Sequence, residues 1–241
     1  MYNLLREQLA PKGILRAGIN LSNFLLVSNK DSSCKPVGIS PDIAYQIAKR
    51  LEVPCELVLF ERPGNIADSA DRDLWDIGNI ASEKSRSESI EFSNPYVLIE
   101  ANFLVKAEDY FQDFSDVDRK DIKIAVSERS AYDLWLTDNI KNATLIRAAS
   151  IQESHDLFFA GDADVLASLK PKLIQDVQIL GGYKILDTAF TSIKQSVGVR
   201  KGKPEAVVFI NQLIESLIKN NWISERLIYH GVHDKLGIPS T

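Results

Sequence analysis

Hydrophobic residues along the chain fall into short runs separated by stretches with helical periodicity. The runs are typical of buried strands and occupy residues 14–19, 53–60, 76–81, 99–105, 122–126, 144–147, 163–167 and 196–200. The stretches between them predict helices over residues 40–51, 66–73, 130–140, 151–159, 172–177 and from 203 onward, with a last short helix near residue 224. Strands and helices therefore alternate, which favours an α/β fold with mostly parallel sheets.

Some of these helices have recognisable starts. Ser40 is suited to cap the first helix, and Pro41 fits its first position. Ser130 also stands directly before a helical pattern, and Lys203-Pro204 opens the longest one. The elements form two blocks that meet around residues 105–109, and the strand and helix after Ser196 could complete either block.

The bulk composition limits the function classes. The chain has 241 residues, 45% of them hydrophobic and 25% charged, which suits one large domain or two modest lobes and excludes wholesale disorder. Its net charge is −5 and it has no block rich in lysine or arginine. Since nucleic-acid binding needs a concentrated basic surface, we expect no nucleic-acid partner.

The ends and cysteines leave two questions open. No apolar run reaches membrane-spanning length, and Arg6, Glu7 and Lys12 lie where a secretory signal would have its apolar core. We expect a cytoplasmic location if the chain is native as printed, and a periplasmic one if a signal peptide was removed. Cys34 and Cys55 fit no metal or redox motif, and the sequence does not decide whether they pair.

Familiar catalytic and cofactor motifs are missing from the sequence. It has no GxSxG elbow, no catalytic-cysteine signature and no glycine-rich phosphate loop. The three histidines, His155, His230 and His233, lie in no HExxH pattern, so we interpret them as surface or core residues. We therefore expect no catalytic residues, no metal and no cofactor.

The remaining candidates are polar residues at the ends of predicted strands, where open α/β sheets bind ligands. They lie in three loops: Asn20, Asn23 and Phe24; then Ala81, Ser82, Glu83 and Arg86; then Ser127, Ser130, Ala131 and Tyr132. A helix N-terminus at Ser130 favours an anion, and Arg86 offers a two-pronged donor, so together they could clamp a carboxylate. Alternatively, Arg86 is a surface charge and Ser130 only a cap.

Four segments, in order along the chain, carry a family resemblance. Residues 86–96, RSESIEFSNPY, closely match the signature Arg-x-x-x-(Val/Ile)-x-Phe-(Ser/Thr)-x-Pro-Tyr. Residues 38–51 with Asp42, the pair Trp75-Asp76, and residues 196–205 match three weaker motifs. The chain thus resembles the family 3 extracellular solute-binding proteins, receptors of polar amino-acid ABC importers. Residues 9–23 and 130–136 are similar to a divergent branch whose members often lack export signals.

The resemblance implies a fold and a function. The fold would be the two-lobed type II periplasmic-binding-protein fold, with lobe 1 over residues 1–105 and 194–241 and lobe 2 over 106–193. Two extended crossings, near residues 99–107 and 188–195, would join the lobes. Arg86 would bind the ligand carboxylate, whereas Phe92 and Tyr96 would serve packing and hinge support. A monomer that delivers its solute to an ABC-transporter permease is expected.

The chain also departs from the family pattern. An acidic residue that holds the α-amino group is expected near Leu169, but Ser168 and Leu169 occupy that stretch. Glu83 could pair with Arg86 or bind a ligand cation, and Arg129 could add a second positive charge. The predicted ligand-binding residues are Arg86, Ser130, Ala131, Tyr132, Asn20, Phe24, Ala81, Ser82, Glu83 and Ser168, with Phe60 as further apolar cover.

Two alternatives share the same fold. The first is an enzyme similar to cyclohexadienyl dehydratases, in which Glu83, Asp164 or Lys170 would act as acid or base. The second is a cytoplasmic ligand-binding sensor without a transporter. The identity of the ligand does not follow from the sequence.

Overall fold

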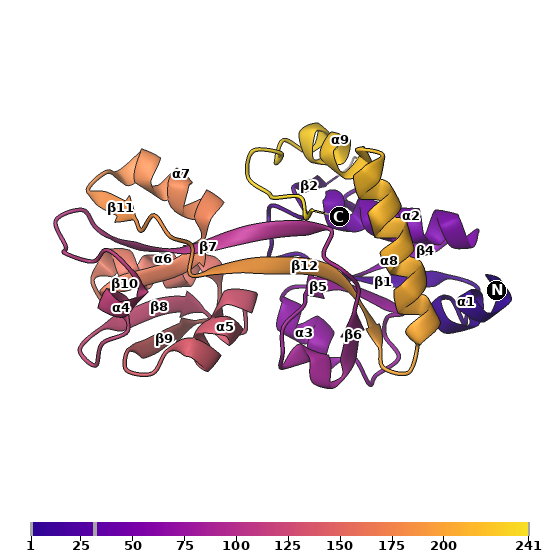
Figure 1. Cartoon of the computed structure of the whole chain (residues 1–241), viewed down its shortest axis with the longest axis horizontal. Coiled ribbons are helices and arrows are strands. Elements are labelled where there is room, and N and C mark those ends of the chain that lie inside the picture. Colours follow the sequence, from indigo (N-terminus) through magenta and orange to yellow (C-terminus); the bar gives the residue numbers. More distant parts are fainter. Residues whose placement is uncertain (1, 31–32, 241) are drawn as a thin grey trace. The chain divides into compact units, whose positions relative to one another are not determined.

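A computed structural model describes residues 2–30 and 33–240, which divide into two compact units (Figure 1). Unit 1 comprises Met1–Leu98 and Lys194–Thr241, and unit 2 comprises Ile99–Ile193. The chain passes from one unit to the other twice, inside strand β7 (Val97–Lys106) and inside strand β12 (Thr191–Arg200).

Unit 1 is built on a sheet whose central strands are parallel. β1 (Leu15–Asn20) pairs in parallel with β4 (Cys55–Phe60) on one side and with β5 (Ile77–Ala81) on the other. β12 then pairs antiparallel with β5, and the short β6 (Ile90–Phe92) pairs antiparallel with β12. All five residues of β5 are buried, which explains its continuous apolar run.

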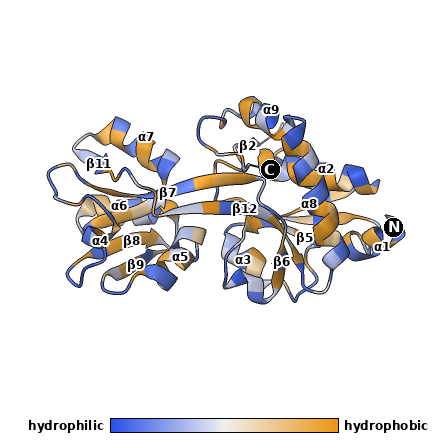
Figure 2. Cartoon of the chain, in the orientation of Figure 1, coloured by the Kyte–Doolittle hydropathy of each residue, from blue (hydrophilic) through white to orange (hydrophobic). Residues whose placement is uncertain are grey.

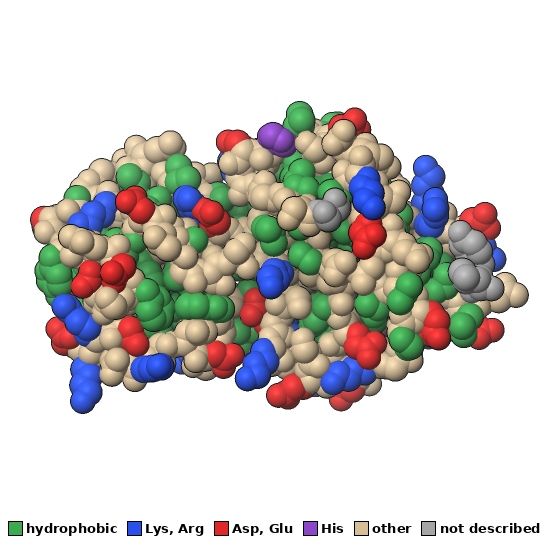
Figure 3. All heavy atoms as spheres, viewed as in Figure 1, with side chains coloured by type: hydrophobic (Ala, Val, Ile, Leu, Met, Phe, Trp, Pro, Cys, Tyr) green, Lys and Arg blue, Asp and Glu red, His purple; other side chains and the backbone are tan. Residues whose placement is uncertain are grey.

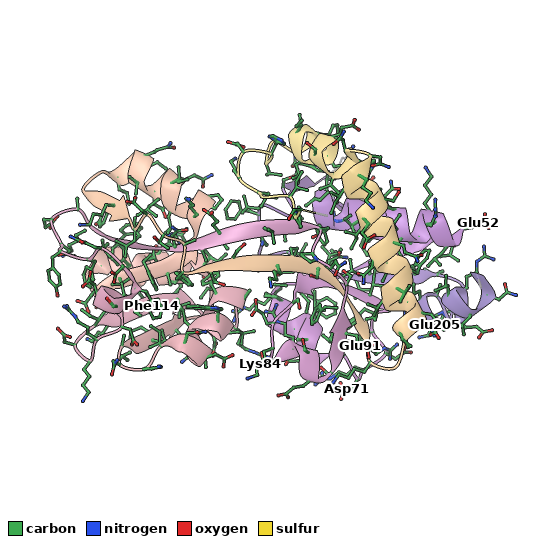
Figure 4. The ribbon with its side chains drawn as sticks, viewed as in Figure 1. Glu52, Asp71, Lys84, Glu91, Phe114 and Glu205 are labelled. Atoms are coloured by element: carbon green, nitrogen blue, oxygen red, sulfur yellow. The ribbon has the colours of Figure 1, made fainter. Side chains whose placement is uncertain are left out.

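Helices cover this sheet. They are α1 (Tyr2–Leu9), α2 (Ile39–Leu51), α3 (Pro63–Asp68), α8 (Pro204–Lys219) and α9 (Trp222–Tyr229), and α8 packs against both α1 and α9 (Figure 1). Figure 2 shows hydrophobic and hydrophilic residues side by side on α8, as expected of a helix with one buried face. Glu205, labelled in Figure 4, accepts a 2.7 Å hydrogen bond from Gln8 of α1 at the start of α8.

Ion pairs and hydrogen bonds of two acidic residues join distant segments of unit 1. Asp76 is fully buried, and its carboxylate accepts hydrogen bonds from the Arg16 backbone N–H at 2.9 Å and guanidinium at 2.8 and 3.0 Å. Asp42 of α2 binds both Arg226 (2.6 Å) and His230 (2.7 Å) at the end of α9. The acidic residues of two family-like motifs thus fix β1 to β5 and α2 to α9.

Unit 2 repeats the arrangement of parallel strands beside antiparallel ones. β8 (Lys123–Ser127) pairs in parallel with β9 (Thr144–Ala148) and with β10 (Val165–Leu169), while β7 pairs antiparallel with β10 and with β11 (Tyr183–Ile185). Hydrophobic residues dominate β8 and β10 (Figure 2). The helices are α4 (Phe114–Val117), α5 (Ala131–Asn139), α6 (Ile151–Ala160) and α7 (Lys170–Leu180).

The predicted α/β pattern is confirmed, with corrections at two helix starts. Ser40 does not cap α2: Gly38 is its N-cap, and the Ser40 hydroxyl bonds the Tyr96 hydroxyl at 2.7 Å instead, so Pro41 is not the first helical residue. The short helix predicted over 66–73 begins earlier, at Pro63, because proline fits a first helical position. The sequence did not predict α1, β6, β11 or the small hairpin of β2 (Asn29–Lys30) and β3 (Pro36–Val37).

Surface charges of both signs are interspersed on the face drawn in Figure 3. Within the described part of the chain, no helix is long and apolar enough to cross a membrane. Cys34 is exposed and Cys55 half-buried, and both are free thiols. Burial raises the pKa of the Cys55 thiol to about 12, so this thiol stays protonated.

Candidate functional site

In unit 1, the predicted residues lie where parallel strands end. β1, β4 and β5 run in the same direction, so their carboxyl ends share one edge of the sheet. Asn20 is the last residue of β1, and its side-chain oxygen accepts hydrogen bonds from the Ser22 N–H (3.1 Å) and hydroxyl (2.8 Å). Phe24 is half-buried in the turn that follows. Ala81 ends β5 at the same edge.

Arg86 is a buried residue in an otherwise exposed turn. Its side chain is 4% exposed and lies in the 3-10 helix η1 (Arg86–Glu88), while Ser85, Ser87 and the Lys84 labelled in Figure 4 are exposed. Guanidinium Nη1 donates to the carbonyl of Ala81 at 2.9 Å. The chain therefore turns back so that the charged head lies beside the carboxyl end of β5, which argues against a solvated surface charge.

The loop between β5 and η1 is held by backbone hydrogen bonds. Ser82 N–H donates to the Lys194 carbonyl at 2.9 Å, which continues the pairing of β5 with β12. The Glu83 carbonyl accepts from the Ser87 N–H at 3.0 Å and from its hydroxyl at 3.1 Å. Ser82 and Glu83 are both half-buried. This short loop is sufficient to place the Arg86 side chain beside the carboxyl end of β5.

The end of the arginine signature belongs to the core of unit 1. Tyr96 is fully buried and its hydroxyl bonds Ser40 of α2 at 2.7 Å. Burial raises the pKa of Tyr96, so the phenol stays neutral. Phe92 is half-buried against the cluster of Ile66, Trp75 and Ile80. These contacts agree with the expected packing role of both aromatic residues.

In unit 2, the predicted residues form the first turn of α5. The Ser130 side chain caps the helix by accepting from the Asp133 N–H at 3.1 Å, as the sequence predicts. Ala131 and Tyr132 follow and are 8% and 2% exposed. Asp133 accepts from the Arg129 N–H at 2.7 Å and from the Arg147 guanidinium at 3.0 Å, so its charge is compensated inside the unit.

Ser168 is placed beside two residues that the sequence did not single out. It lies near the end of β10, is fully buried, and its hydroxyl bonds His155 Nε2 at 2.9 Å. His155 Nδ1 lies 2.7 Å from Asp176 Oδ2. The three residues come from β10, α6 and α7, and no local motif connects positions 155, 168 and 176. The histidine is a core residue, one of the two places expected for it.

The residues that the enzyme alternative would need have structural contacts. The Asp164 carboxylate accepts from the Lys123 N–H at 2.8 Å, and Lys170 pairs with Glu100 at 2.5 Å. In residues 2–30 and 33–240, no group of three or more histidine, cysteine or acidic residues could hold a metal ion.

The sequence pattern of the bacterial extracellular solute-binding proteins, family 3, matches residues 15–229. The chain belongs to this family. The match includes every predicted ligand-binding residue, and the family members are mostly binding proteins without enzymatic activity. No curated protein matches the chain.

Solved structures show the same fold at low sequence identity. One is a substrate-binding protein of an amino-acid ABC transporter from Streptococcus pneumoniae, bound to L-arginine. It is 20% identical to this chain with a TM-score of 0.76, and the match covers 95% of this chain and 99% of the Streptococcus pneumoniae chain. An ancestral amino-acid-binding protein, described as a precursor of cyclohexadienyl dehydratase, is 23% identical (TM-score 0.74; 93% and 98% covered). A lysine-bound putative ABC-transporter binding component from Wolinella succinogenes is 21% identical (TM-score 0.74; 89% and 94% covered). These similarities identify the type II periplasmic-binding-protein fold.

Proposed function

We propose that this family 3 protein binds a small carboxylate-bearing solute, closes its two units around it and delivers it to an ABC importer. The observation that carries the proposal is the buried guanidinium of Arg86, held at the carboxyl end of β5 by the Ala81 carbonyl. The donor fork of an arginine matches the two oxygens of a carboxylate.

The start of α5 supplies the second half of the proposed clamp. The first N–H groups of a helix have no partner inside the helix, and together with the helix dipole they attract an anion. Ser130 satisfies the N–H of Asp133, which leaves the N–H groups of Ala131 and Tyr132 at the helix end for a carboxylate oxygen. Phe24 and the Tyr132 ring would provide apolar cover.

We do not extend the proposal to catalysis. Two of the three residues considered as acid or base, Asp164 and Lys170, are engaged by Lys123 and Glu100 of the same unit. Likewise, no contact among residues 2–30 and 33–240 favours a sensor over a transport receptor. The lysine and arginine bound in two similar solved structures each carry a carboxylate, which supports a carboxylate-bearing solute, and sequence identities of 21% and 20% do not name one.

Two matched serine caps test the α5 half of the proposal. Ser130→Ala and Ser150→Ala each remove an N-cap whose oxygen accepts a 3.1 Å hydrogen bond, from Asp133 N–H and from Glu153 N–H. We expect each variant to lose about 1 kcal/mol in the free energy of unfolding. Only Ser130→Ala should weaken binding of carboxylates, measured by calorimetry with a panel of amino acids, hydroxy acids and dicarboxylates. Equal affinities in the two variants would contradict a ligand site at α5.

A further inference from the structure

A line of buried polar groups runs through unit 2 toward the start of α5. Asp176 of α7 lies 2.7 Å from His155 Nδ1 of α6, and His155 Nε2 lies 2.9 Å from the Ser168 hydroxyl of β10. His155 and Ser168 are fully buried, and Asp176 is 6% exposed. The Tyr132 hydroxyl lies at the other end, near the hydroxyls of Ser168, Ser127 and Ser130. His155 and Asp176 take no part in the proposed carboxylate clamp of Arg86 and α5.

Asp176, His155, Ser168 and Tyr132 form a relay of polar groups. The charges of its members decide which group donates and which accepts each hydrogen bond. Asp176 contacts Lys172 as well as His155, and an acceptor oxygen beside Nδ1 selects the His155 tautomer with the proton on Nδ1. The contact between His155 Nδ1 and Asp176 Oδ2 is electrostatic, since neither of these two atoms reaches hydrogen-bond geometry with a described residue. Burial lowers the pKa of His155, so the ring is neutral and Nε2 is an acceptor. The Ser168 hydroxyl must therefore donate to His155, and its oxygen can only accept.

The Tyr132 hydroxyl, at the end of the relay nearest the start of α5, makes no hydrogen bond to a described residue. Burial raises the pKa of Tyr132 to about 12, against the opposite effect of the neighbouring serine hydroxyls, so the phenol is neutral. Tyr132 is 2% exposed, yet its hydroxyl reaches hydrogen-bond geometry with none of the described residues. Buried hydroxyls are normally bonded, and a ligand at the start of α5 can provide that bond.

We propose, building on the solute-binding function above, that Tyr132 and Ser168 receive a neutral hydrogen-bond donor of the ligand, and that His155 and Asp176 are positioning residues for them. The Ser168 oxygen can only accept, so its partial negative charge favours a Tyr132 O–H that points toward it, although the two hydroxyls do not reach hydrogen-bond geometry. The lone pairs of the Tyr132 oxygen then remain for the ligand. The solute would be a carboxylate that carries a hydroxyl, rather than an ammonium, beside the carboxyl group.

Charge decides between hydroxyl and ammonium. An ammonium group in a dry site needs a nearby anion, whereas a hydroxyl needs only an acceptor. Among the described residues, three acidic groups near these side chains have partners: Asp176 contacts His155 and Lys172, Asp133 binds Arg147, and Asp156 accepts a hydrogen bond from Gln152 at 2.8 Å. The relay therefore offers the ligand the neutral hydroxyl oxygen of Tyr132, which suits a ligand hydroxyl, whereas a ligand ammonium would require a negatively charged oxygen.

Matched pairs of ligands test the inference. L-malate is compared with L-aspartate, and L-lactate with L-alanine, by calorimetry on the whole chain. We expect the hydroxy acid of a pair to bind about tenfold more tightly, the worth of roughly one hydrogen bond. Tyr132→Phe should abolish this preference without lowering the melting temperature, because it removes a hydroxyl that has no aligned partner. Tyr183→Phe, a change at a half-buried tyrosine of β11, should retain the preference.

Nitrogen NMR tests the positioning role directly, because the chain has only three histidines. We expect His155 to carry its proton on Nδ1 at neutral pH, and Asp176→Asn to shift the ring toward the other tautomer and reduce the hydroxy-acid preference. A proton on Nε2 in the wild type would overturn the inference. So would tighter binding of the amino acids, a preference that survives Tyr132→Phe, or no binding of any of the four acids.

These failures are distinguishable from failure of the proposed function. A wild-type protein that prefers the amino acids would still be a carboxylate-binding protein, with its ammonium partner elsewhere. If none of the four acids binds, release of another carboxylate from the purified protein would leave the solute-binding function standing and remove only the relay.

Discussion

At the scale of single residues, the most informative side chains are polar groups that the fold buries. Arg86 and Tyr132 are almost completely buried, one on the turn after β5 and the other on the first turn of α5. Burying a hydroxyl costs free energy unless it is bonded, which makes Tyr132 a stronger candidate for ligand contact than an exposed polar residue. Arg86 is a candidate because its donor fork matches a carboxylate. Asn20 bonds its own turn and is a weaker candidate.

The buried His155 should make stability depend on pH. Burial lowers the pKa of His155 below its ordinary value of 6.5 against the pull of Asp176, while Lys172 adds to the lowering. The unfolded chain therefore binds a proton that the folded chain does not, so the free energy of unfolding falls as pH drops below about 6.5 toward the folded pKa. The slope approaches about 1.4 kcal/mol per pH unit for one proton.

Chemical denaturation across that pH window measures the effect. His155→Gln should lose this part of the slope, whereas the exposed His233→Gln should keep it. Asp133, whose pKa burial raises, contributes a slope of opposite sign nearer its ordinary value of 3.8, which is why the comparison is made between variants. Parallel curves for wild type and His155→Gln would refute the neutral, buried histidine.

At the scale of elements, the apolar runs located the longer strands, because buried parallel strands are hydrophobic on both faces. The short β6 and β11 have three residues each and could not be separated from neighbouring loops by periodicity. The start of α2 was misjudged because a serine before a helical pattern looks like a cap. Its hydroxyl is instead used by Tyr96, which is 56 positions away.

The start of α2 also gives a stability prediction. A Cβ at Gly38 would lie 2.2 Å from the Leu26 carbonyl oxygen, a contact that only backbone movement can relieve. Gly38→Ala should therefore cost roughly 1–3 kcal/mol in the free energy of unfolding, or more. Gly161→Ala, at the end of α6, meets no atom within 4 Å and should cost only about 1 kcal/mol from its positive φ. A smaller loss of unfolding free energy for Gly38→Ala than for Gly161→Ala would contradict this prediction. It would show that the backbone before α2 moves easily to accommodate a Cβ.

At the scale of the whole molecule, the arginine signature and its neighbouring motifs predicted the family, which the match over residues 15–229 confirms. The same motifs indicated Arg86, and the strand-end rule indicated Ser130, Ala131 and Tyr132. Sequence reasoning could not find the relay through His155 and Asp176, because its members are distant in sequence and no family motif includes them. Local patterns thus predict elements and single anchors, whereas polar networks require the fold.

The most direct test of the central claim is native mass spectrometry of the protein after incubation with a mixture of amino acids, hydroxy acids, dicarboxylates and ring acids. We expect the folded wild type to retain one compound, and denaturation to release that compound unchanged as a carboxylate. Arg86→Ala should fold but retain none, whereas Arg50→Ala, at an exposed position of α2, should retain it. Release of a compound without a carboxyl group, or full retention by Arg86→Ala, would contradict the proposed function.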